Sequence, residues 1–76
     1  MDKQQIAHTL EKEISLINID LRRLYRIRQQ TIDSHQARDI DDIIQNLVAH
    51  KQKLENIVEN IVEDAKIYNH TSNFNL

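Results

Sequence analysis

The sequence predicts an all-α protein that folds as one antiparallel two-helix hairpin with coiled-coil-like packing. Its 76 residues include no glycine and no proline, on which tight turns and β-hairpins depend most. Two long segments repeat apolar residues at alternating steps of three and four, which is a heptad pattern. A short stretch of β-branched and small polar residues separates these segments. We therefore expect one domain over residues 1–76, with a helix over 2–31, a turn over 32–36, a helix over 37–68 and a frayed tail over 69–76.

The first predicted helix has a single apolar seam. Ala7 begins this seam, and Arg28 and Thr31 continue it toward the turn. The apolar residues between them are Leu10, Ile14, Ile17, Leu21 and Leu24. Ile6, Tyr25, Ile27 and Ile32 flank the seam and widen it.

The second predicted helix carries a longer seam with a wider apolar face. Its seam positions are Ile40, Ile44, Leu47, Lys51, Leu54, Val58, Ile61, Ala65 and Tyr68. Ile43 and Ile57 flank one side of the seam, and Val48 and Val62 flank the other. Two paired helices need a narrower stripe than this. The polar Lys51 interrupts the seam, and a polar seam residue often sets register and partner choice.

The turn is predicted from local side-chain chemistry. Asp33 or Ser34 can cap the second helix, and Asp33 with Gln36 resembles a capping box. In a hairpin Asp41 would lie opposite Arg28 and could pair with it. The residues after 68 lose the heptad period, which predicts fraying, with Phe74 and Leu76 as anchors. One continuous helix that pairs with a second copy remains an alternative, because glycine and proline are absent.

The size of the chain predicts that something completes the hairpin. A chain of this length buries a modest fraction of its surface, and no cysteine can supply a disulfide. Residues 1–38 carry seven basic and five acidic residues, a net charge of +2. Residues 39–76 carry three basic and seven acidic residues, a net charge of −4. Opposite signs favour a hairpin, and we expect a partner protein or self-association to complete it.

We predict no catalytic site, no metal site and no cofactor. The histidines are too widely spaced to share neighbouring helix turns: His8, His35, His50 and His70. Asp39, Asp41 and Asp42 lie where a helix start favours negative charge. The sequence has no membrane-spanning apolar run, and residues 1–10 lack the hydrophobic stretch of a signal peptide. The expected location is therefore the cytoplasm, without membrane contact.

The predicted function is binding to another protein. Leu16 and Ile19 lie off the seam and would face solvent in a lone hairpin. Two consecutive Glu-Asn-Ile-Val segments build a broad ridge of Ile57, Val58, Ile61 and Val62. We predict that these six residues bind a partner, while Leu21, Leu24, Ile44, Leu47 and Leu54 pack within the hairpin. Scattered surface apolar residues are the alternative explanation.

The second half resembles a family of small co-chaperones. The segment Leu54-Glu55-Asn56-Ile57-Val58-Glu59-Asn60-Ile61-Val62, continuing to Tyr68-Asn69-His70, is similar to the YscE/SsaE/EscE group of bacterial type III secretion systems. The resemblance implies a two-helix fold and a larger helical-repeat chaperone as the partner. It also implies that the pair keeps an aggregation-prone needle subunit soluble before export.

Two other functions remain open. Arg22, Arg23, Arg26 and Arg28 surround Leu24-Tyr25, and such a cluster either binds phosphate or forms a solvated, ion-paired helix face. Presented twice, it would suit a four-helix dimer that binds nucleic acid and resembles the plasmid regulator Rop. The stretch Ala37-Arg38-Asp39-Ile40-Asp41 with Ile43-Ile44 resembles small response-regulator phosphatases, although their signature begins with Ser where Ala37 stands.

Overall fold

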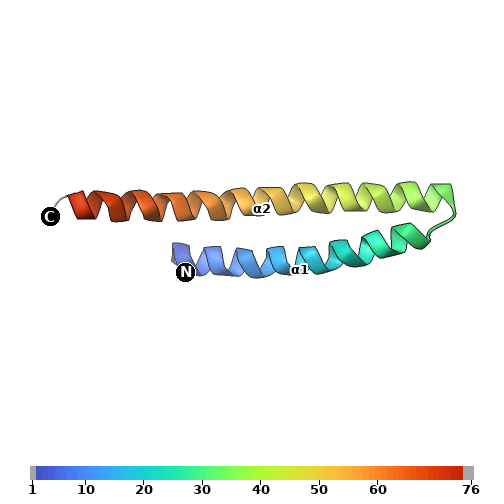
Figure 1. Cartoon of the computed structure of the whole chain (residues 1–76), viewed down its shortest axis with the longest axis horizontal. Coiled ribbons are helices and arrows are strands. Elements are labelled where there is room, and N and C mark those ends of the chain that lie inside the picture. The colour runs from blue at the N-terminus through green and yellow to red at the C-terminus, as the bar shows by residue number, and fades with distance from the viewer. Residues whose placement is uncertain (1, 75–76) are drawn as a thin grey trace.

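The chain forms two helices that pack antiparallel as a hairpin (Figure 1). The computed structural model describes the backbone of residues 2–74 and the side chains of residues 2–64. Helix α1 spans Lys3–Gln30 and helix α2 spans Ser34–Phe74. The hairpin is 65 Å long and only 17 and 16 Å in its other dimensions. The predicted all-α hairpin is confirmed, and the alternative of one continuous helix is wrong.

The start of α1 is held by a reciprocal pair of hydrogen bonds. The backbone N–H of Gln5 donates to Asp2 Oδ1 at 2.8 Å, and the backbone N–H of Asp2 donates to Gln5 Oε1 at 3.0 Å. This capping box satisfies two N–H groups that a helix start otherwise leaves without partners. This capping box is an addition to the features predicted from the sequence.

The connection between the helices is shorter than predicted. Asp33 caps α2, because its Oδ1 accepts a hydrogen bond from the backbone N–H of Gln36 at 2.9 Å. The helix therefore begins at Ser34, directly after its cap, and not at residue 37. Thr31 has left the helical conformation, so α1 ends at Gln30. Ile32, between them, is 98% exposed.

The core is the predicted seam. Ile17, Leu21 and Ile44 are buried at its centre, and Leu24, Ile40, Leu47 and Leu54 pack against them. Ala7 and Ala37 are also buried, one on each helix. Ala37 continues the heptad pattern of α2 by one step toward the turn. Among the described side chains, none is fully enclosed, as expected for a single helix–helix contact.

Two ion pairs define the register of the helices. Arg28 Nε lies 2.8 Å from Asp41 Oδ1 near the turn, which confirms the pair predicted from sequence. Lys3 Nζ lies 3.6 Å from Asp64 Oδ2 at the open end. The start of α1 is therefore level with Asp64, and α2 extends beyond it (Figure 1).

The extension of α2 corrects the predicted tail. The backbone stays helical to Phe74, six residues beyond the predicted end at 68. Asn, His, Thr and Ser lower helix propensity but do not stop a helix as proline does, and proline is absent. Residues 75 and 76, and the side chains of Ala65, Tyr68 and Phe74, lie outside the described part. Within that part, neither helix is long and apolar enough to cross a membrane.

Candidate protein-binding surfaces

The hairpin leaves more large apolar side chains exposed than it buries. Five residues are buried in the described part, two of which are alanines. Ten large hydrophobic residues are exposed: Ile6, Leu16, Ile19, Tyr25, Ile27, Ile32, Ile43, Val48, Ile57 and Val62. Apolar surface of this extent on an elongated hairpin indicates a protein partner or self-association.

Four of the exposed residues form one side of the hairpin, which we call the isoleucine face. They are Ile6, Ile27, Ile43 and Ile57, and they are 37%, 49%, 48% and 45% exposed. Each directly precedes a seam residue that starts a heptad: Ala7, Arg28, Ile44 and Val58. In an antiparallel pair, positions that precede such seam residues on both helices fall on the same side. Each helix therefore contributes two isoleucines to a common face.

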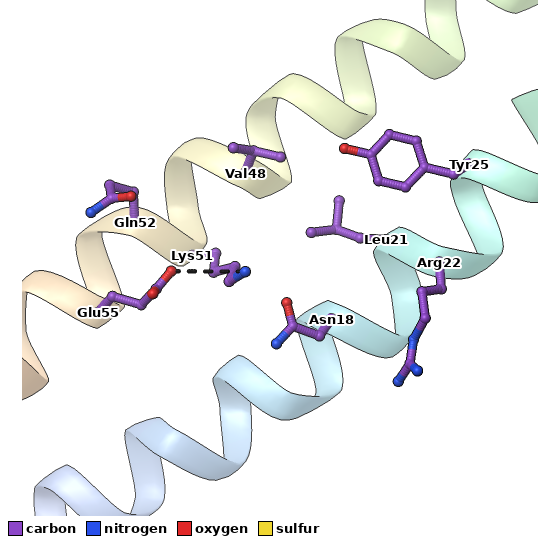
Figure 2. Close-up of a pocket in the computed structure, with 8 residues that line it drawn as sticks. All are labelled: Asn18, Leu21, Arg22, Tyr25, Val48, Lys51, Gln52 and Glu55. Carbon is purple, nitrogen blue, oxygen red and sulfur yellow. Dashed lines mark ion pairs between the residues drawn. The ribbon is translucent and has the colours of Figure 1, made fainter.

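The opposite side holds an open groove of about 560 Å³ (Figure 2). Eight residues line it: Asn18, Leu21, Arg22, Tyr25, Val48, Lys51, Gln52 and Glu55. Tyr25 and Val48 each follow a seam residue, as do Asn18 and Glu55. Figure 2 shows Tyr25 directing its hydroxyl toward α2 beside Val48, while Arg22 turns away from the groove. This side mixes polar and apolar groups, and the exposed large apolar residues of this flank are Tyr25, Val48 and Val62, against four isoleucines on the isoleucine face.

Lys51 is the polar interruption in the seam of α2. It is half-buried, and its Nζ lies 3.9 Å from Glu55 Oε1 one turn along the same helix. Figure 2 shows the side chain between the two helices, near Asn18 of α1. At this level the hairpin has an amine where an apolar side chain would complete its core.

The six predicted partner-binding residues do not share one surface. Leu16 and Ile19 are exposed on the outer side of α1. Ile57 and Val62 are exposed on opposite flanks of α2, Ile57 on the isoleucine face. Val58 and Ile61 are half-buried seam residues. The ridge predicted from Ile57, Val58, Ile61 and Val62 is therefore divided into two flanks by the pairing with α1.

The arginine cluster is divided in a similar way. Arg28 pairs with Asp41 and is half-buried. Arg22, Arg23 and Arg26 are exposed, and within the described side chains no ion pair includes them. Among the described side chains, the ion pairing expected from sequence is therefore seen for Arg28, while the other three arginines of the cluster are exposed to solvent.

Asp39, Asp41 and Asp42 lie beyond the first turn of α2, which begins at Ser34 and holds no acidic residue in that turn. Across the residues whose side chains are described, no three His, Cys, Asp or Glu residues converge. In the stretch that resembles response-regulator phosphatases, Ala37 is buried, while Arg38 and Asp39 are exposed.

Comparisons with family models, curated protein sequences and solved structures gave no match to this chain. The functional proposal therefore depends on the exposed surfaces of the hairpin.

Proposed function

We propose that this protein is a helical binding module, of the co-chaperone or adaptor type, that packs apolar side chains against helices of another protein. The observation that carries the proposal is the excess of exposed over buried large apolar residues on the hairpin. Covering such surface releases water and stabilises the complex by about 25 cal/mol per Å². A preformed hairpin also presents this surface without a folding cost at the moment of binding.

The co-chaperone role rests on the resemblance of residues 54–62 to the type III secretion group. In the hairpin this segment is a continuous part of α2, with Ile57 and Val62 exposed on either flank. A helical-repeat chaperone offers grooves between helices, into which an amphipathic helix can lay its apolar residues. The proposed partner is therefore a larger helical-repeat protein, and the proposal assigns no catalytic group, metal or cofactor to this chain.

Leu16 and Ile19 provide the sharpest test of binding. Both are exposed and lie off the seam, so aspartate at either position should leave the hairpin folded. A tagged Leu16→Asp/Ile19→Asp variant is compared with Thr9→Asp/Ser15→Asp in pull-downs from the cell that makes the protein. The control adds the same charge to exposed positions of the same helix.

We expect the control to retain the partner and the Leu16→Asp/Ile19→Asp variant to lose at least about 90% of it, since buried apolar anchors dominate interfaces. Equal retention by both variants would remove these residues from the binding surface. Identification of the retained protein by mass spectrometry tests the finer proposal. A partner without helical repeats would end the co-chaperone assignment.

A second candidate, nucleic-acid binding, is favoured by one observation. Arg22, Arg23 and Arg26 are exposed on α1 and are not used in ion pairs within the described part. Fluorescence anisotropy with duplex RNA and duplex DNA at about 50 mM salt is the test, because phosphate contacts strengthen as salt falls. Binding that Arg22→Gln/Arg26→Gln weakens would support this function. No binding at that salt concentration would exclude it.

A further inference from the structure

We infer that the isoleucine face is covered by a second copy of this chain, giving a four-helix bundle in which both turns lie at the same end. The inference deepens the proposed function, since it names the partner of one face, and it rests on the same excess of apolar surface. It leaves the groove, Leu16 and Ile19 outside the centre of the dimer interface.

The isoleucine face has the pattern of a bundle core. Helices that face a multi-helix core use about three of every seven positions, the two seam positions and one neighbour. On this hairpin the neighbouring position is isoleucine twice in each helix. The corresponding positions on the other flank hold one tyrosine and two valines, Tyr25, Val48 and Val62, beside the polar Glu11, Asn18, Asp41 and Glu55. Both flanks also carry polar residues, and the isoleucine side is distinguished by its four isoleucines.

The register favours a second copy as the occupant. The two interhelical ion pairs place Ile27 about level with Ile43, Asp20 about level with His50, and Glu13 about level with Ile57. A two-fold axis along the bundle lays α1 of each copy against α2 of the other. Ile27 then meets Ile43 of the second copy, and Asp20 meets His50 of the second copy. The Ile27–Ile43 contact is apolar on both sides and Asp20 has a basic partner, while Glu13 lies against Ile57 of the second copy.

Charge selects this arrangement over the reversed one. With the turns at opposite ends, α1 would lie against α1 of the second copy. A two-fold axis at the Asp20 level would then set Ile43 against Ile57 of the second copy, but it would bring the two Asp20 carboxylates together and the two His50 side chains together. With the turns together, each Asp20 instead lies beside His50 of the second copy. Opposite charges across an interface favour the correct orientation and disfavour the wrong one.

The size of the face is sufficient for a dimer. Helix α1 has 28 residues, so the paired part of the hairpin is about 42 Å long at 1.5 Å per residue. Two helices, each about 10 Å wide, give a footprint on the order of 800 Å² per copy. Stable specific interfaces typically bury about that area on each partner. The isoleucine face is thus large enough without help from other surfaces.

The first experiment is light scattering on the full chain between about 10 and 200 μM, a range suited to an interface of standard size. We expect the mass of two chains for the unchanged protein. Ile43→Asp should lower the dimer fraction at least tenfold while circular dichroism still reports a helical hairpin. The matched control is Val48→Asp, since Val48 lies on the other flank of α2 and is 43% exposed against 48% for Ile43. Ile27→Asp repeats the test on α1.

Spin labels test the orientation. Because the chain contains no cysteine, Ile32→Cys introduces a single labelling site at the exposed turn. Turns at the same end should give a distance under about 30 Å. Turns at opposite ends should give about 40 Å or more, the length of the paired helices. The longer distance would overturn the proposed orientation.

The outcomes separate this inference from the proposed function. A single-chain mass at every concentration would overturn the dimer and leave the Leu16 and Ile19 pull-down result unaffected. A dimer that survives both Ile43→Asp and Ile27→Asp would show that the isoleucine face is not the interface. Retention of the other protein by the Leu16→Asp/Ile19→Asp variant, with the dimer intact, would instead remove the proposed partner surface and leave the dimer in place.

Discussion

Leu16 and Ile17 are neighbours in sequence but lie in opposite environments. Ile17 is 3% exposed at the centre of the seam, while Leu16 is 56% exposed. Ile17→Ala should lower the free energy of unfolding by about 2–4 kcal/mol, because it removes buried methyl groups and leaves a cavity. Leu16→Ala, the matched control, should change it by less than about 0.5 kcal/mol. Urea unfolding measures the free energy of unfolding of both variants, and equal losses would contradict the assignment of Ile17 to the core.

The Arg28–Asp41 pair is the only long-range ion pair near the turn among the described side chains, yet its expected contribution is small. Both side chains remain substantially exposed at 39% and 46%. Water and salt screen such a pair, so Asp41→Ala should cost at most about 1 kcal/mol. Asp42→Ala removes the same charge from the neighbouring exposed position and serves as the control. A double-mutant cycle that combines Asp41→Ala with Arg28→Ala measures the coupling free energy between the two side chains. A coupling well above about 1 kcal/mol would contradict the small contribution expected for this pair.

At the scale of elements, the start of α2 depends on one carboxylate. Asp33 Oδ1 accepts the hydrogen bond from the Gln36 N–H group that the first turn cannot satisfy internally. Asp33→Ala should therefore lower the free energy of unfolding by about 1 kcal/mol. Asp33→Asn should keep most of the stability of the unchanged protein, because asparagine also caps helices well. Thermal unfolding followed by circular dichroism compares the two. Similar losses of the free energy of unfolding in both variants would show that the Asp33 cap does not stabilise the start of α2.

The seam of α2 would gain from an apolar residue at its interruption. Lys51 is half-buried, and burial of a leucine there removes apolar area from water. Lys51→Leu should raise the free energy of unfolding by on the order of 1 kcal/mol. Lys53→Leu is the control, since Lys53 is exposed and lies off the seam. A destabilised Lys51→Leu protein would show that the amine has a structural partner that an apolar residue cannot replace.

The elements were predictable from sequence to the extent that they depend on periodicity. Apolar steps of three and four identified Ile17, Leu21 and Ile44 as core, because a helix places such positions on one side. The boundaries depend on caps, and the hydrogen bonds between Asp2 and Gln5 require a backbone geometry that composition does not reveal. The common face of Ile27 and Ile43 also depends on a three-residue connection that sets the register, whereas the sequence indicated a longer turn.

For the whole molecule, the shape limits how stable a single chain can be. A hairpin 65 Å long and about 17 Å wide has one internal contact surface and a large outer one. Small chains bury a low fraction of their surface, and those without disulfides or metals gain stability from association. Dimerisation would convert exposed isoleucine side chains into core and would make the folded state depend on protein concentration.

The unfolding midpoint should therefore rise with protein concentration. When a folded dimer unfolds to separate chains, mass action stabilises the folded state as concentration rises. A tenfold increase in protein should contribute about 1.4 kcal/mol per mole of dimer and raise the unfolding midpoint by several degrees. Ile43→Asp should unfold at a midpoint independent of concentration, because its hairpin unfolds alone. Val48→Asp should keep the dependence of the unchanged protein. Calorimetry at two concentrations distinguishes the cases, and a midpoint that does not move for the unchanged protein would mean that the hairpin reaches its full stability without a second copy.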